Sequence, residues 1–295
     1  DTRKPTWVDA FVGRLGAGAP AIDGTWSPSS LEKLGECGFK FFAAKVLGLK
    51  EREDPEIETR TREQGTLFHH VLAEFLKAHP RLPADLDAAR ALGRSFVTAS
   101  QASAAAAIVA KDESFLAITW ARLAAALDEL IVIEHAEQVQ READGLSIER
   151  WLEKDIDFTL DDASGAIQLH GKADRIEVMR RGAKAERLRV VDYKVVRSQK
   201  DYRAGLDPAR LMGHTRFQIP VYLLGALEER LGGAGDDVAL SGGYLALLAR
   251  IADKQVMGDF EHAQLDGGPE AVTARIRTLV GHARAVQEQL DGLGQ

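Results

Sequence analysis

The stretch that most constrains this chain is residues 171–196, where two segments of alternating apolar residues flank a short, charged, glycine-bearing connection. This pattern predicts two strands joined by a hairpin turn. The first strand carries Asp174, and the second carries Asp192 and Lys194. Because side chains at i and i+2 share a face of a strand, these last two point the same way and Tyr193 points the other way. In an antiparallel hairpin Asp174 can join them, so the stretch predicts two carboxylates and an ammonium at one place.

Carboxylate oxygens are the ligands that hard divalent ions such as Mg²⁺ prefer. A bound ion can orient a phosphate and generate a nucleophile from water near neutral pH, and a lysine can hydrogen-bond that water or offset charge on the phosphate. A lone D-x-K pattern is more often a solvated salt bridge. Here Val190 and Val191 precede the charges and Val195 and Val196 follow them. Buried charges persist only when paired or metal-bound, which favours a metal site.

The pattern G-x-x-D-R-I-E followed by V-D-Y-K resembles the core motif of the PD-(D/E)XK nuclease superfamily, in particular the RecB and AddB nuclease domains of bacterial helicase–nuclease complexes. The residues that fall on it are Gly171, Asp174, Arg175, Asp192, Tyr193 and Lys194. The resemblance implies that Asp174 and Asp192 hold a metal ion and that Lys194 positions or activates water. It also implies substrate contacts from Arg175 and Tyr193.

A second pattern, Gly65-Thr66-Leu67-Phe68-His69, lies in a helix predicted over 63–78 and is similar to the G-x-x-x-H motif of RecB-like nucleases. The resemblance implies that His69 faces the metal, as a ligand or phosphate contact through a neutral imidazole nitrogen. Taken alone, such a histidine is more often an ordinary surface or core residue, as His70 beside it illustrates. The strand motif further along the chain favours the metal-facing role for His69.

The resemblance further implies a metal-binding glutamate at the start of the preceding strand. Glu153 is the best match and Glu149 the second, and an exposed acid at a strand edge is the alternative for either.

A fourth pattern, Q-x-P-x-Y, is formed by Gln218, Pro220 and Tyr222 in a helix predicted over 213–231. Gln218 and Tyr222 are four residues apart and share one helical face, so the resemblance implies that both orient substrate. Arg216 could add a phosphate contact. We expect Pro220 to kink this helix, because it removes a hydrogen bond.

Cys37 is the chain's single cysteine, in a serine-rich segment that also resembles AddB-type nucleases. There the resemblance implies the first of four ligands to an iron–sulfur cluster. Four thiolates are the usual requirement, so a 4Fe-4S cluster is not possible with this chain. Loss of the cluster and truncation of the chain both remain open, and the alternative is that Cys37 is a small buried residue.

The fold class predicted is α/β, a PD-(D/E)XK restriction-endonuclease-like core with a small mixed sheet flanked by helices. Residues 1–26 are predicted to be a linker or arm and 27–295 the nuclease domain, with a helical insertion at about 84–142. The charged segment 51–62 is expected to be exposed. The strands are predicted at 152–160, 167–179, 187–196 and 240–250.

The chain is acidic, with 38 basic against 45 acidic residues and a net charge of −7. A free-standing DNA-binding protein is usually basic, so we expect DNA to be gripped locally or delivered by a partner. No apolar run approaches the roughly 20 residues that span a membrane, and the start resembles no signal peptide. With one cysteine, these features favour the cytoplasm. The chain begins at Asp1 without methionine, so we expect a piece of something longer.

The leading hypothesis is a Mg²⁺-dependent deoxyribonuclease, with Mn²⁺ as a substitute ion. We expect an exonuclease domain of a helicase–nuclease in DNA repair and recombination, acting on single-stranded DNA. No P-loop is present, so a helicase motor would lie elsewhere. The alternative is a catalytically idle nucleic-acid-binding or scaffold domain of such a complex. A stand-alone defence or CRISPR-associated exonuclease is a third possibility.

Overall fold

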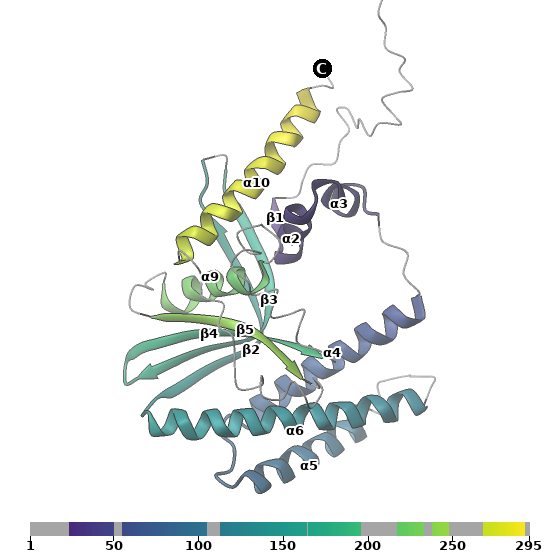
Figure 1. The fold of residues 1–295 in the computed structure, drawn as a ribbon, viewed down its shortest axis with the longest axis vertical. Coiled ribbons are helices and arrows are strands. Elements are labelled where there is room, and N and C mark those ends of the chain that lie inside the picture. Colours follow the sequence, from purple (N-terminus) through teal and green to yellow (C-terminus); the bar gives the residue numbers. More distant parts are fainter. Residues whose placement is uncertain are drawn as a thin grey trace, which may run out of the picture.

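The fold is a mixed five-stranded sheet with helices on both faces (Figure 1), and it confirms the predicted α/β class. We describe it from a computed structural model. The structure describes residues 24–49, 55–104, 113–163, 165–195, 217–232, 238–247 and 268–292.

The sheet is organised around its third strand. The strands are β1 (Thr25–Trp26), β2 (Ser147–Leu160), β3 (Ile167–Arg181), β4 (Lys184–Val195) and β5 (Ala239–Leu247). β3 pairs antiparallel with β2 along one edge. Its other edge is shared by β4, antiparallel at residues 175–181, and by β1, parallel at residues 168–169. β5 then pairs parallel with β4. The predicted hairpin of β3 and β4 is therefore the centre of the sheet.

Two groups of helices cover the sheet. The helices are α2 (Pro28–Glu36), α3 (Gly38–Phe41), the π-helix η2 (Phe42–Val46), α4 (Pro55–Ala78), α5 (Leu86–Ala104), α6 (Glu113–Ala143), α9 (Gln218–Leu231) and α10 (Gly268–Gly292). Figure 1 shows α2, α9 and α10 on one side, and α4, α5 and α6 on the other. In the described part of the chain, no helix has both the length and the apolar character needed to cross a membrane.

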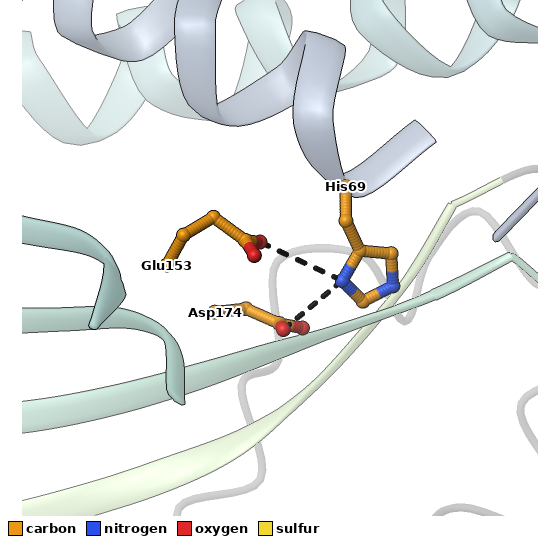
Figure 2. A group of neighbouring side chains, drawn as sticks. All are labelled: His69, Glu153 and Asp174. Atoms are coloured by element: carbon orange, nitrogen blue, oxygen red, sulfur yellow. Dashed lines mark ion pairs between the residues drawn. The ribbon is translucent and has the colours of Figure 1, made fainter. Parts of the chain in front are cut away.

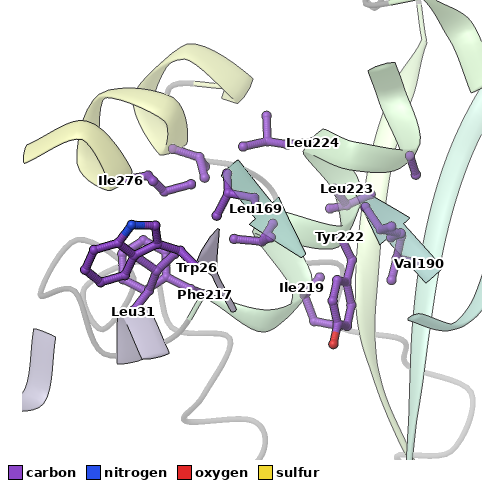
Figure 3. Packing of buried hydrophobic residues seen from close by; sticks show 14 of the residues in the cluster. Trp26, Leu31, Leu169, Val190, Phe217, Ile219, Tyr222, Leu223, Leu224 and Ile276 are labelled. Carbon is purple, nitrogen blue, oxygen red and sulfur yellow. The ribbon is translucent and has the colours of Figure 1, made fainter. Parts of the chain in front are cut away.

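Each face of the sheet has its own hydrophobic core. On the first, residues of α2, α9 and α10 pack on the sheet, with Leu31, Phe217, Leu223 and Ile276 among the buried side chains (Figure 3). On the second, α4, α5 and α6 bury a separate cluster against β4 and β5. Residues 84–142, which were predicted to be a helical insertion, include most of α5 and α6, and these two helices supply much of the second core.

Several predicted boundaries differ from the structure. Residues 25–26, assigned to an N-terminal arm, form β1, and Trp26 is buried and stacked on Phe41 with ring centroids 5.5 Å apart. The helix predicted to begin at residue 63 begins at Pro55. The helix around Pro220 begins at Gln218, so this proline lies in the first turn. The N–H groups of a first turn have no intrahelical partner, so the expected kink was wrong.

A glycine shows how closely α9 packs on the sheet. A Cβ atom on Gly225 would lie 2.1 Å from Ile156 Cγ2 and 2.9 Å from a ring carbon of Phe158. We predict that Gly225→Ala lowers the free energy of unfolding by about 1–3 kcal/mol, because the core cannot take the methyl group. Urea denaturation measures this.

Gly281→Ala in α10 is the matched control, since nothing lies within 4 Å of its added Cβ. There the exchange should stabilise by about 0.5–1 kcal/mol, the ordinary helix preference of alanine. Equal effects at the two positions would contradict the close approach of α9.

Candidate active site

The candidate site lies where β3 and β4 separate. Their pairing ends at Arg175 and Val191; beyond it β4 continues along β5, and β3 continues along β2. Asp174 and Asp192 are the next residues on the two strands. The backbone N–H of Tyr193 donates a 2.7 Å hydrogen bond to Asp174 Oδ2. A side-chain carboxylate thus satisfies a backbone group that strand pairing leaves free at this fork.

The alternation of side chains reverses at the same level. On β3, Leu169 and Ala173 face the α9 core before Asp174, and Ile176 and Val178 face it afterwards. Odd-numbered residues of β3 therefore face this core before Asp174, and even-numbered residues face it afterwards. Side-chain direction follows period two only while a strand stays regular, so the backbone is irregular here.

On β2 the reversal occurs at Glu153. Its flanking residues pair with Arg175 and Ala173, which puts it opposite Asp174, and its φ of 51° is left-handed. It is the one non-glycine residue with positive φ in the described chain. Such a conformation costs on the order of 1–2 kcal/mol and is typical of functional sites. The distortion aims the Glu153 carboxylate toward Asp174.

His69 on α4 completes a group of three possible metal ligands (Figure 2). Its Nδ1 lies 3.0 Å from Asp174 Oδ1 and 3.9 Å from Glu153 Oε1. One ligand atom from each residue lies within 4.8 Å of the others. The group therefore joins a helix to two neighbouring strands at a single point.

These three residues fit a divalent metal ion. Glu153 Oε1 is buried without a hydrogen-bond partner among the described residues, which leaves a lone pair free for a cation. Two carboxylates that face each other also repel unless positive charge lies between them. Carboxylates suit Mg²⁺, Ca²⁺ and Mn²⁺, and imidazole suits Mn²⁺ and later transition metals. The donors thus favour a divalent ion without selecting one.

The pKa of His69 reflects the negative charge of the carboxylates around it. Burial by itself lowers the pKa of His69, but the hydrogen bond and negative charge of Asp174 outweigh burial and raise the pKa above its usual value. Asp174 therefore favours the protonated form of His69 more than water would.

A second set of contacts lies on the α9 side of the fork. Lys194 Nζ is 2.6 Å from Asp192 Oδ2, and Gln218 Nε2 donates a 2.5 Å hydrogen bond to Asp192 Oδ1. Gln218 Oε1 also accepts from Lys194 Nζ at 3.4 Å. Burial raises the pKa of Asp192 to about 6, against the lowering effect of Lys194. The amide thus fixes the aspartate and the lysine relative to each other.

Tyr222 lies one turn after Gln218, as predicted, and is buried. Burial raises its pKa to about 12, so the phenol keeps its proton at neutral pH. A Cβ atom on Gly171 would lie 2.6 Å from Tyr222 Cε1. The glycine of the G-x-x-D pattern is therefore where the tyrosine ring approaches the strand.

Two predicted substrate contacts do not face the site. Arg175 is fully buried below α6, where it pairs with Glu134 at 2.5 Å and with Glu177 at 2.5 Å. Tyr193 is buried in the same core, and its hydroxyl accepts a 3.1 Å hydrogen bond from Arg175 Nη1. These positions correct the expectation that Arg175 and Tyr193 bind substrate, because neither side chain reaches the surface.

Two other residues also differ from expectation. Glu149, the second match for the metal-binding glutamate, pairs with Arg180 at 3.3 Å and lies away from the group around Glu153. Cys37 is exposed, so the expectation of a small buried residue was wrong. Arg216 lies outside the described residues.

Sequence reasoning missed the ionic network around Arg175. It joins α6 to three strands and consists of Glu134, Glu137, Arg150, Arg175, Glu177 and Arg189. One signal was available: Glu177 and Arg189 lie between apolar residues in strands that the sequence predicts to be buried. Charges there require partners, but the partners on α6 were not identifiable from spacing.

The sheet forks around carboxylates, a lysine and a histidine, and this arrangement defines a candidate site for a divalent metal ion. The chain matches a family model described as the PD-(D/E)XK nuclease superfamily over residues 25–291. It therefore belongs to this superfamily, whose nucleases use divalent metal ions. A search of curated proteins found no match.

The strain at Glu153 leads to a prediction. In EDTA, the free energy of unfolding of Glu153→Gly should equal that of the wild type or exceed it by up to about 1 kcal/mol. The reason is that glycine accepts a left-handed backbone. Glu153→Gln keeps the strain and should not gain stability. Both variants should bind Mn²⁺ at least 10-fold more weakly, since each lacks the carboxylate; calorimetric titration tests this. A glycine variant less stable than the glutamine variant would contradict the assigned strain.

The burial of Arg175 leads to a prediction about stability. Arg175→Gln should lower the free energy of unfolding by about 3–5 kcal/mol without any nucleic acid, because two buried glutamates lose their partner. Arg180→Gln, which breaks the more exposed pair with Glu149, should cost less than about 1 kcal/mol. If Arg175→Gln left stability unchanged and weakened only nucleic-acid binding, the original substrate assignment would be restored.

Proposed function

We propose that this chain is a divalent-metal-dependent deoxyribonuclease that hydrolyses DNA phosphodiester bonds. The observation that carries the proposal is the fork, where His69, Glu153 and Asp174 form a ligand group beside the Asp192–Lys194 pair. Mg²⁺ is the ion we propose, with Mn²⁺ as a substitute, because the carboxylates are hard oxygen ligands.

The residues divide the chemistry between them. His69, Glu153, Asp174 and Asp192 would hold the ion, which supplies polarisation of the phosphodiester and activation of water. Lys194 presents a positive charge next to Asp192, where it can hold the attacking water or stabilise charge on the phosphate. Gln218 holds the side chains of Lys194 and Asp192 in place relative to each other through its two hydrogen bonds.

The finer proposal concerns the substrate and its delivery. The net charge of −7 supports a chain that does not collect DNA by a broadly basic surface. We therefore propose an exonuclease domain of the RecB/AddB type in DNA repair or recombination, supplied with single-stranded DNA by a helicase domain or subunit. An idle scaffold would not require the lysine and the acidic residues together at the fork.

The test removes one reacting group at a time. Asp192→Asn and Lys194→Met should each lower cleavage of single-stranded DNA in Mg²⁺ by at least about 100-fold, while the fold persists by circular dichroism. EDTA should abolish cleavage by the wild type. Asp157→Asn, an exposed carboxylate paired with His170, is the control and should cleave normally.

Cleavage that persists in both site variants would overturn the assignment. The absence of both cleavage and carboxylate-dependent Mg²⁺ or Mn²⁺ binding would support the scaffold alternative. Labelled 5′ and 3′ ends and a circular substrate separate exonuclease from endonuclease action.

A further inference from the structure

A second lysine lies beside the metal-ligand group, at a position outside the predicted motif residues. Lys172 is on β3, two residues before Asp174, and its Nζ is 2.7 Å from Glu153 Oε2. Its side chain is 52% exposed and that of Glu153 is 22% exposed. The ammonium thus reaches a largely buried carboxylate from the solvent side.

The charges at the fork are paired one by one. Glu153 pairs with Lys172, Asp192 pairs with Lys194, and Asp174 accepts hydrogen bonds from Tyr193 N and faces His69 Nδ1. The side chain of Glu153 also leaves Oε1 without a hydrogen bond and directed at the His69 group. The same carboxylate therefore offers one oxygen to the lysine and the other to the ligand group.

The two lysines differ in how firmly they are held. Lys194 is 25% exposed, bonds to Gln218 and lies 5.3 Å from the centre of the Tyr244 ring. Among the described residues, the ammonium of Lys172 forms its ion pair with Glu153, and half of the lysine side chain is in solvent. A long, exposed lysine loses little when it swings away, because surface ion pairs contribute little stability.

We propose that Lys172 is the internal counter-ion of the metal site. Its ammonium neutralises Glu153 in the metal-free protein and competes with the incoming cation for that carboxylate, which sets the affinity for the metal. The inference rests on the proposed function, since it assumes that the His69 group binds a metal ion. It assigns Lys172 the opposite effect from a ligand: its removal should strengthen metal binding.

Electrostatics explains why removal of Lys172 should strengthen metal binding. A positive charge beside a cation site repels the cation, and the pair with Glu153 must also be broken before both carboxylate oxygens are available. An ordinary lysine side chain is charged at neutral pH, so the repulsion is present under the conditions of the titration. Solvent exposure reduces the interaction, so we expect a change of about 3- to 10-fold in the dissociation constant.

Lys154 is a matched control. It follows Glu153 directly in β2 and its side chain is 39% exposed, but its ammonium lies 4.0 Å from Glu229. Lys154→Gln makes the same change in net charge close to the site without removing the contact. A general effect of net charge would therefore appear equally in both variants.

The experiment is a calorimetric titration of Mg²⁺ and Mn²⁺ into the full chain. Lys172→Gln should bind about 3- to 10-fold more tightly than the wild type, with a smaller advantage in 0.5 M salt. Lys172→Arg and Lys154→Gln should bind like the wild type. Unchanged or weaker binding by Lys172→Gln, or an equal gain in Lys154→Gln, would overturn the proposal.

Thermal unfolding gives a second readout that does not require cleavage. The rise in melting temperature between EDTA and excess Mg²⁺ should be larger for Lys172→Gln, because at one ligand concentration the stabilisation of the folded state grows with the logarithm of the affinity. If the wild type bound no metal, the proposed function and this inference would both fail. If the wild type bound metal and cleaved nothing, only the proposed activity would fail.

Discussion

The separation of β3 from β4 is the constraint on which the site depends. A sheet that forks exposes backbone groups that would otherwise pair, and a buried unpaired N–H is costly. Here one oxygen of the Asp174 carboxylate accepts a hydrogen bond from the backbone N–H of Tyr193, which satisfies that group at the fork. The other oxygen faces His69. Fold and chemistry therefore share one residue. A side chain without an acceptor at 174 would disturb the strand geometry as well as the ligand group.

On the α6 side of the fork, a buried ionic network lies beside the apolar packing of the second core. Three arginines and three glutamates bind α6 to β2, β3 and β4. The pairs stabilise the fold little in net terms, since desolvation offsets their attraction, but each partner is costly to remove. Their effect is geometric. Arg175 follows Asp174 and also contacts the Tyr193 hydroxyl, so the helical insertion fixes both strands at the point where they part.

The sequence predicted those parts of the site that depend on regular structure. Asp192 and Lys194 share a face because β4 stays regular, and Gln218 and Tyr222 share a face because α9 does. The role of Glu153 followed from resemblance, but its left-handed backbone did not, because period two holds only up to the irregular residue itself. Arg175 was misassigned for a related reason. Spacing gives the direction of a side chain, whereas its burial depends on α6, about 40 residues earlier in the chain.

The charges at the fork also bear on how the metal relates to folding. Small metal-dependent domains need the ion to fold, because their ligands have no other partners and their cores are small. Here two hydrophobic cores cover the two faces of the sheet, and neither includes the ligand group. Glu153, Asp174 and Asp192 each have a lysine, a histidine or a backbone amide as partner. The chain can therefore keep its fold without the ion, which leaves metal affinity free to be adjusted by the lysines beside the site and not by the requirements of stability.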